Sequence, residues 1–162
     1  LYASIKEAKT WKEKFRLLFK QDREELLFKK LDEGYQTIDV NNCIDLAPIL
    51  FVFASLKHGA KLTGTSRLAI KESNRALAVK EELMKVGIDI QVNEDSVLIE
   101  KQELRIVDGV EFDSHNDHRI AMALSLLSSK MNIVINGCEA INKSYPNYFE
   151  ELEKLGGKIR YE

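Results

Sequence analysis

The pattern of hydrophobic and polar positions predicts alternating helices and strands. Residues 45–57 and 117–127 are apolar on almost every side, which indicates two buried helices. Residues 73–86 and 146–155 have apolar positions at helical spacing and end at glycine, which indicates two amphipathic helices. The side chains expected on the buried side of the first are Ala76, Leu77, Val79, Leu83 and Val86. Short β-like runs occupy residues 37–40, 60–65, 88–92, 97–100, 104–107, 131–135 and 158–161, and the third and fourth of these are expected to form a hairpin.

The start of the chain has a less regular pattern. Trp11, Phe15 and Leu18 recur at helical spacing, so a helix is expected over residues 4–19. Residues 24–31 fit either a second helix or a pair of strands, and the pattern does not distinguish between them.

The order of elements repeats with a shift of 72 residues. Asp45 precedes Lys71 by 26 residues, and Asp117 precedes Lys143 by 26 residues. Each aspartate begins an apolar helix, and each lysine lies just before an amphipathic one. We therefore predict an α+β fold of repeated units that share a core. The expected organisation is a single domain over 1–162, with a helical lead segment over 1–36, a first unit over 37–101 and a second unit over 102–162.

Composition narrows the class of protein. Of 162 residues, 44% are hydrophobic and 31% are charged, and the formal net charge is −2, so neither nucleic acid nor a membrane is an expected partner. Cys43 and Cys138 lie far apart without metal-ligand spacing, so we expect two reduced thiols, no metal and a cytoplasmic location. Because the chain begins with Leu1 and has no signal-peptide pattern, we expect a piece of a longer protein.

Cationic side chains lie at three predicted helix starts. A helix N-terminus disfavours cations unless an anion binds there. Lys71 and Arg75 flank Glu72, and both a surface salt-bridge network and an anion site fit this cluster. Lys143, considered alone, fits a solvated lysine.

The third helix start combines Asp117, His118 and Arg119. Asp117 fits a helix N-cap, and it also fits an ion-pair partner for Arg119, which is attached to a buried helix. If the repeat brings the three helix starts to one face, their cations form a pocket for a small carboxylate–phosphate compound. Asp45 and Glu72 would then be available to move protons.

Four segments resemble motifs of the 5-enolpyruvylshikimate-3-phosphate synthase family. Residues 67–75, RLAIKESNR, are similar to its R-L-R-x-K-E-S-D-R signature, and residues 117–123 match its D-H-R-x-A-M-A segment. Residues 143–148 match K-S-[YF]-P-x-[FY], and residues 45–48 resemble a P-D-L-x-P helix start that lacks its first proline. Asn74 stands where the family has aspartate, so a helix cap is kept and a charge is lost.

The resemblance implies the enolpyruvate transferase fold, an alpha-beta prism of repeated βαβαββ units, of which this chain would supply about two. It implies transfer of the enolpyruvyl group of phosphoenolpyruvate to the 5-hydroxyl of shikimate 3-phosphate, with release of phosphate, in aromatic amino-acid biosynthesis. It implies no metal and no organic cofactor. The N-terminal domain that would complete the active site is not part of this chain.

The resemblance also implies residue roles. The implied catalytic residues are Asp45, Lys71 and Glu72. Phosphoenolpyruvate would be bound by Arg75, Arg119 and Lys143. Shikimate 3-phosphate would be bound by Asp45, Lys71 and Arg67, with Asp117 and His118 in support.

Two other interpretations remain. Enolpyruvyl transferases that act on UDP-N-acetylglucosamine share the fold, although the K-E-S-N-R and D-H-R segments favour the shikimate enzyme. The chain alone is also expected to be an inactive folded fragment, because the N-terminal domain would hold the shikimate phosphate and exclude water.

Overall fold

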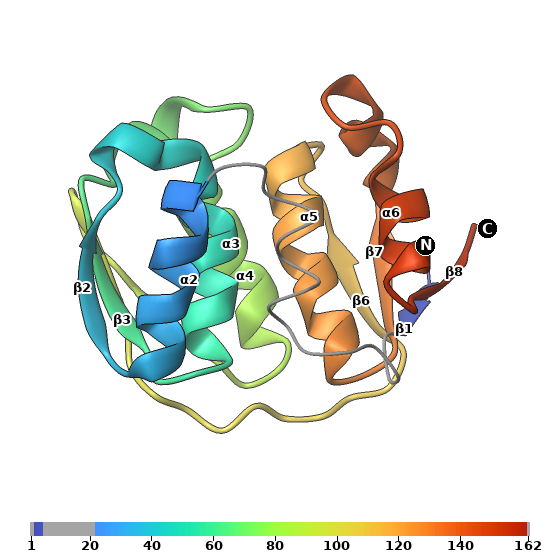
Figure 1. Cartoon of the computed structure of the whole chain (residues 1–162), viewed down its shortest axis with the longest axis horizontal. Coiled ribbons are helices and arrows are strands. Elements are labelled where there is room, and N and C mark those ends of the chain that lie inside the picture. The colour runs from blue at the N-terminus through green and yellow to red at the C-terminus, as the bar shows by residue number, and fades with distance from the viewer. Residues whose placement is uncertain (1, 5–21, 162) are drawn as a thin grey trace.

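A computed structural model describes residues 2–4 and 22–161 of the chain (Figure 1). The strands of this part are β1 (Tyr2–Ser4), β2 (Gln36–Asp39), β3 (Ala60–Thr63), β4 (Gln91–Val92), β5 (Ser96–Ile99), β6 (Val110–Asp113), β7 (Ile133–Asn136) and β8 (Lys158–Arg160). The α-helices are α2 (Asp22–Glu33), α3 (Ala47–Ser55), α4 (Arg75–Met84), α5 (His118–Ser125) and α6 (Tyr148–Lys154). Short 3-10 helices are η1 (Asn41–Leu46), η2 (Ser66–Ile70), η3 (Leu126–Ser129) and η4 (Cys138–Lys143).

In the described part of the chain, two four-stranded sheets have the same order of strand directions. Their strand orders are β2-β3-β5-β4 and β6-β7-β1-β8, and in each sheet the first two strands are parallel and the other pairs antiparallel. The predicted repeat is therefore confirmed, with α3, η2 and α4 in the first unit corresponding to α5, η4 and α6 in the second. The place of β5 is taken in the second sheet by β1, which lies within the expected lead segment. The unit boundaries themselves stay a prediction.

The core lies between the two sheets, where α3, α4 and α5 are packed (Figure 1). Every residue of α3 is buried, including Leu50, Phe51 and Val52. Burial of one such side chain stabilises the fold by about 1.5–3 kcal/mol, so an all-apolar helix is stable only in this central position. Within the described residues, no helix has the length and hydropathy needed to cross a membrane.

Most predicted elements are present with shorter bounds. The four predicted helices correspond to α3, α4, α5 and α6, and the expected hairpin is formed by β4 and β5. The undecided segment 24–31 is helical, because it lies within α2. The helix expected over 4–19 lies outside the described residues except for Ser4, which ends β1.

Two expectations are wrong. Residues 104–107 form no strand, since the partner of β7 is β6, with Val110 opposite Ile133 and Phe112 fully buried. Leu77 does not face the core and is 50% exposed. The buried side of α4 is centred on Val79 and Leu83, and a position two residues before Val79 lies on the opposite side of a helix with 3.6 residues per turn.

Glycines end the parallel strands β3 and β7 and direct the chain toward the functional residues. Gly64 and Gly137 have φ of 74° and 70°. A Cβ atom on Gly64 would lie 2.7 Å from Oδ1 of Asp39, and one on Gly137 would lie 2.6 Å from Oγ of Ser114. Glycine is required for both reasons. It allows η2 to begin three residues after the end of β3 and η4 to begin two residues after the end of β7.

Candidate active site

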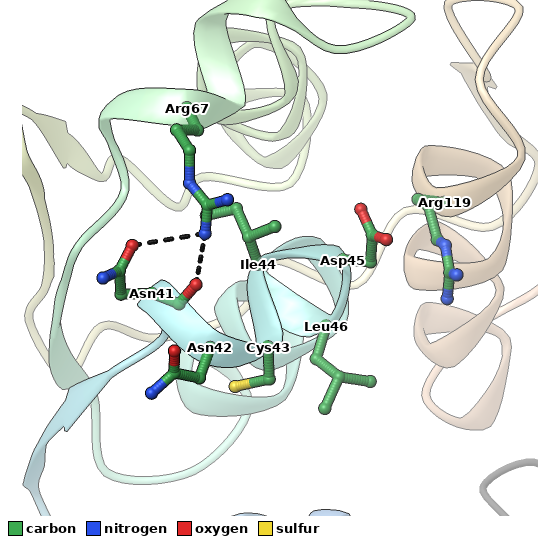
Figure 2. A pocket seen from close by; sticks show the side chains of 8 residues that line it. All are labelled: Asn41, Asn42, Cys43, Ile44, Asp45, Leu46, Arg67 and Arg119. Carbon is green, nitrogen blue, oxygen red and sulfur yellow. Dashed lines mark hydrogen bonds between the residues drawn. The ribbon is translucent and has the colours of Figure 1, made fainter.

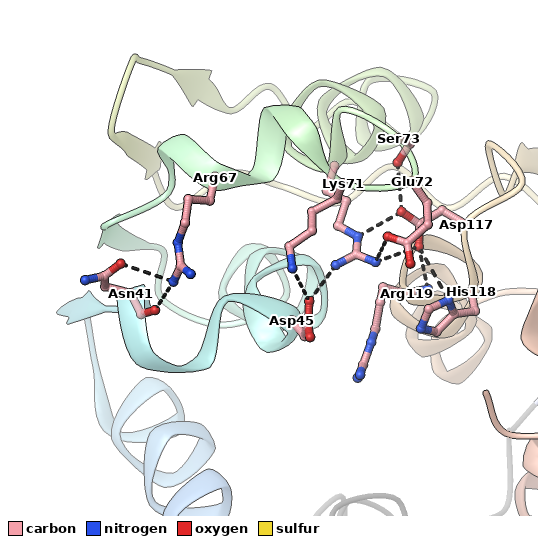
Figure 3. A network of polar contacts seen from close by, with 10 residues as sticks. Asn41, Asp45, Arg67, Lys71, Glu72, Ser73, Asp117, His118 and Arg119 are labelled. Atoms are coloured by element: carbon pink, nitrogen blue, oxygen red, sulfur yellow. Dashed lines mark hydrogen bonds and ion pairs between the residues drawn. The ribbon is translucent and has the colours of Figure 1, made fainter. Parts of the chain in front are cut away.

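The starts of the central helices meet at the upper end of the molecule in Figure 1. Asp45 comes from η1, just before α3, and Lys71, Glu72 and Ser73 come from the segment between η2 and α4 (Figure 3). Residues 117–119 begin α5. The fold therefore brings both repeated units to one cluster of polar side chains.

Arg75 is the centre of this cluster, although its side chain is only 1% exposed. Its Nε donates to Oδ2 of Asp117 at 2.8 Å, its Nη1 to Oδ1 of Asp45 at 2.8 Å, and its Nη2 to Oε2 of Glu72 at 2.6 Å. Burial by itself would lower the pKa of the guanidinium, but the hydrogen bond and charge of Asp117, with Glu72 and Asp45, raise it above its usual value. A buried arginine is stable only with such partners.

Asp117 connects three segments of the chain and is fully buried. It caps α5 by accepting the amide hydrogen of Arg119 at 2.9 Å, and it accepts the hydroxyl hydrogen of Ser73 at 2.9 Å as well as the bonds from Arg75. Burial would raise the pKa of its carboxyl, but the hydrogen bonds from Arg75 and from the Arg119 amide lower it overall. The N-cap expected for Asp117 is present, and its ionic partner is Arg75.

Asp45 is the accessible carboxylate of the cluster, with a side chain that is 48% exposed. Nζ of Lys71 lies 3.2 Å from its Oδ1, which also accepts from Arg75. Partial burial would raise its pKa, but hydrogen bonds from Lys71 and Arg75 and the charge of Arg119 lower it overall. Asp45 is therefore ionised at neutral pH and is open to a ligand.

An open cavity of about 740 Å³ lies beside Asp45 (Figure 2). Most of its wall is formed by residues 41–46, and cations stand on two sides, Arg67 from η2 and Arg119 from α5. Arg67 donates to the backbone oxygen and, at 3.2 Å, to the side-chain oxygen of Asn41. Nε of Arg119 is buried without a hydrogen-bond partner among the described residues. A buried donor left without an acceptor is costly, so an anionic acceptor in the cavity would be favourable.

Comparison with known proteins identifies the family. Residues 12–152 match the sequence profile of the family described as EPSP synthase (3-phosphoshikimate 1-carboxyvinyltransferase). The chain belongs to the EPSP synthase family.

Individual members of the EPSP synthase family are similar over part of their length. The 3-phosphoshikimate 1-carboxyvinyltransferase of Clostridium kluyveri is 44% identical over 126 residues, which are 75% of this chain and 29% of that protein. That of Clostridium acetobutylicum is 45% identical over 126 residues, with the same coverage. The chain thus spans less than a third of the length of these relatives.

Solved structures agree with the family and with the predicted fold. An EPSP synthase from Acinetobacter baumannii superposes with a TM-score of 0.64 at 31% identity, over 75% of this chain and 30% of that one. The enolpyruvyl transferase NikO from Streptomyces tendae gives a TM-score of 0.60 at 17% identity, which is evidence for the fold alone. The predicted enolpyruvate transferase fold is confirmed.

The structure brings most of the residues singled out in the sequence into one network. Asp45, Lys71, Glu72, Arg75 and Asp117 are joined by hydrogen bonds and ion pairs. The ring of His118 lies beside this network, with Nδ1 3.9 Å from Oδ1 of Asp117. Burial and the charge of Arg119 lower the pKa of His118, so its ring is largely neutral at pH 7.

Lys143 is less closely connected to this network than the other predicted site residues. It is exposed at the end of η4, which packs against α5, and among the described residues no hydrogen bond or ion pair joins it to the network. The segment of η4, brown-red at the upper right of Figure 1, lies at the same end of the molecule as the network. Its role remains a prediction.

Two contributors were not expected from the sequence. Ser73 binds Asp117, and Asn41 binds Arg67. Ser73 lies inside the recognised signature, so its position contained a signal. Asn41 had none, because its contact depends on the approach of η1 to η2 in the folded chain.

One group of side chains in the described part has metal-ligand chemistry. Ligand atoms of Glu81, Glu82 and His115 lie within 4.8 Å of one another. Oε2 of Glu82 already accepts from Nζ of Lys85 at 2.7 Å and from the Asp113 amide at 3.0 Å. The positive charge beside Glu82 is therefore supplied by Lys85, and the group is arranged as an ion-pair cluster.

Proposed function

We propose that this chain is part of an enzyme that transfers the enolpyruvyl group of phosphoenolpyruvate to the 5-hydroxyl of shikimate 3-phosphate and releases phosphate. One observation carries the proposal. In a member of the EPSP synthase family, the same open cavity is lined by Arg119, whose Nε is unpaired, and by Asp45, whose carboxylate is exposed. A cation for an anionic donor and a base for a hydroxyl acceptor are the two groups that this transfer requires.

Phosphoenolpyruvate would be held by Arg119, Arg75 and Lys143. Arg119 would make the first contact, because its Nε is unpaired. Arg75 is shared among Asp117, Asp45 and Glu72, so an anion would reach it only if a carboxylate moved aside. Asp117, with Ser73, would keep the guanidinium of Arg75 in place during this exchange.

The acceptor would bind on the Asp45 side of the cavity. Asp45 and Lys71 would contact the shikimate ring, and Arg67 would contribute a weaker contact from η2. As the 5-hydroxyl oxygen bonds to C2 of phosphoenolpyruvate, Asp45 would take the hydroxyl proton, which suits its ionised state. Lys71, 3.2 Å from Asp45, would stabilise the charge on that carboxylate.

Glu72 would serve the methylene carbon of the donor. Its protonated carboxyl would deliver a proton to C3 as the new C–O bond forms. The resulting carboxylate would take a proton back from C3 when the bond from C2 to the phosphate oxygen breaks, and the proton held by Asp45 would pass to the departing phosphate. Glu72 is 52% exposed on its side chain and bound to Arg75, which would stabilise its carboxylate after the proton has left.

The part of the family's length that this chain does not span would complete the site. We propose that it holds the phosphate of shikimate 3-phosphate and excludes water, so that the chain alone has no activity. The same proposal makes the whole protein a cytoplasmic enzyme of aromatic amino-acid biosynthesis that uses no metal and no organic cofactor.

A chimaeric enzyme tests the proposal. The chain would be fused to the part of the Clostridium acetobutylicum relative that it does not match, and phosphate release would be measured with both substrates. Turnover is expected with shikimate 3-phosphate and not with UDP-N-acetylglucosamine. Arg119→Ala in the same fusion should abolish it, and a folded fusion without turnover would contradict the proposal.

A further inference from the structure

The turn before α5 has an unusual backbone. His115 and Asn116 have φ of 52° and 53°, two consecutive left-handed residues that are not glycine. Residues with a Cβ atom keep such conformations only where surrounding contacts hold them. Asp117 and Arg119 follow this turn directly, so its geometry decides where both side chains lie.

Two of the contacts that hold the turn come from Glu82 on α4. Glu82 is fully buried, and its Oε2 accepts from the backbone amide of Asp113 at 3.0 Å. Its Oε1 lies 2.9 Å from Nε2 of His115. Lys85 balances the charge of the carboxylate at 2.7 Å and also donates to the backbone oxygen of Glu111 at 3.1 Å. Both oxygens of the Glu82 carboxylate are therefore bound to the segment 113–115.

Hydrogen bonds within the turn transmit this constraint. The His115 amide donates to Oδ1 of Asp113 at 2.6 Å, and the Asn116 amide donates to Oγ of Ser114 at 3.2 Å. Ser114 in turn donates to the backbone oxygen of Gly137 at 2.8 Å. The turn is therefore held both by Glu82 and by its own side chains.

Glu82 and Arg75 act on the same segment from the same helix. They are seven residues apart on α4, which places them on one face, and both are buried. Arg75 binds Asp117 at the end of the turn, and Glu82 binds Asp113 and His115 at its beginning. Two buried residues on one face of α4 therefore bind both ends of the segment 113–117.

We infer that Glu82 is a positioning residue of the active site, which fixes the turn 113–116 and thereby the places of Asp117 and Arg119. Its effect on catalysis rests on the proposed function, while its effect on the turn does not. A side chain with only a packing role would not need two buried acceptor atoms directed at one loop. A carboxylate bound to a backbone amide sets the position of that backbone within hydrogen-bond distance.

The test is Glu82→Gln in the fusion enzyme, with two matched controls. Glutamine keeps the size but presents an NH2 group to one of the donors that now bind the carboxylate. Glu94→Gln makes the same chemical change at an exposed residue between β4 and β5, and Val79→Ala loosens the buried side of α4 while it keeps the Glu82 carboxylate. The KM for phosphoenolpyruvate is expected to rise about tenfold or more in Glu82→Gln and to stay unchanged in both controls.

A second measurement is independent of turnover. The amide resonances of residues 116–119 should shift in Glu82→Gln and stay in place in Val79→Ala. If the wild-type fusion has no activity, the proposed function fails, and these resonances alone decide the inference. Unchanged resonances, or a KM that rises equally in Val79→Ala, would overturn it.

A milder variant covers the case in which Glu82→Gln does not fold. His115→Asn removes the contact to Oε1 of Glu82 and keeps a residue that tolerates the left-handed conformation. The same resonances should shift and the KM should rise in the same direction. Wild-type values for both would overturn the inference.

Discussion

Arg75 and Asp117 are separated by 42 residues in the sequence, yet Nε of the arginine lies 2.8 Å from Oδ2 of the aspartate. Their side chains are 1% and 0% exposed. One residue belongs to the first repeated unit and the other to the second, so this ion pair joins the two units. The stability of the core and the geometry of the site therefore depend on the same contact.

Asp117→Asn should destabilise the chain strongly. The buried guanidinium of Arg75 would lose its most buried anionic partner, and breaking a buried pair from one side costs about 3–5 kcal/mol. The free energy of unfolding in urea measures this loss. Asp45→Asn is the control, because Asp45 is 48% exposed and its removal should cost only about 1 kcal/mol. Equal losses in the two variants would contradict the assigned importance of burial.

Stability should fall in acid because of the same carboxylate. The pKa of Asp117 is below its ordinary value of 3.8 in the folded chain, so its contribution is complete above that value and is lost as the pH drops through the folded pKa. Unfolding free energies of the wild type and of Asp117→Asn, measured between about pH 2 and 6, should converge toward the acid end. A constant difference over this range would show that the charge of Asp117 is not responsible.

Arg119→Lys should weaken binding of phosphoenolpyruvate to the fusion enzyme about tenfold to a hundredfold. Lysine keeps the charge but lacks the buried Nε donor and the planar fork that match a carboxylate or a phosphate. Titration followed by calorimetry gives the dissociation constant. Arg67→Lys is the comparison, since Arg67 already binds Asn41 and should affect shikimate 3-phosphate more than phosphoenolpyruvate. If Arg67→Lys weakened binding of phosphoenolpyruvate more than Arg119→Lys did, the roles assigned to the two arginines would have to be exchanged.

Gly64→Ala should destabilise the chain by about 1–3 kcal/mol. Its φ is 74°, and a Cβ atom would meet Oδ1 of Asp39 at 2.7 Å and the Cβ of Asn41 at 2.9 Å. Thermal unfolding measures the loss. Gly34→Ala is the matched control, because a Cβ atom there meets nothing within 4 Å, and the free energy of unfolding should change little or increase.

Much of the fold could be predicted from the spacing of apolar residues, because both repeated units bury an apolar helix. The apolar runs that became α3 and α5 occupy the centre between the sheets, so their pattern is strong on every side. The strand predicted over residues 104–107 was wrong, because local alternation cannot identify the strand that pairs with β7. That strand is Val110–Asp113. The prediction that Leu77 is buried was wrong because it relied on the residue type. The angular position of Leu77 on α4 places it on the exposed side.

The site was predictable as a set of residues and not as an arrangement. Motifs at helix starts identified Arg75, Asp117 and Arg119, since helix termini give local signals. The sharing of Arg75 among three carboxylates depends on contacts over 30 and 42 residues, which no local pattern contains. Glu82 could not be predicted for the same reason. In the sequence it is an ordinary helical glutamate, and its contacts with the turn 113–116 exist only in the folded chain.

The insertion of β1 between β7 and β8 has a consequence for how the chain acquires its structure. In the second sheet, Ala3 lies opposite both Ile133 and Ile159, so β1 pairs with two strands that follow it by about 130 residues or more. Contacts between residues so distant in sequence form slowly, because a long loop must close before they are gained. During synthesis, β1 can therefore form these pairs only after residues 133–160 have been made. The first sheet, whose strands are all contributed by residues 36–99, is free to assemble earlier.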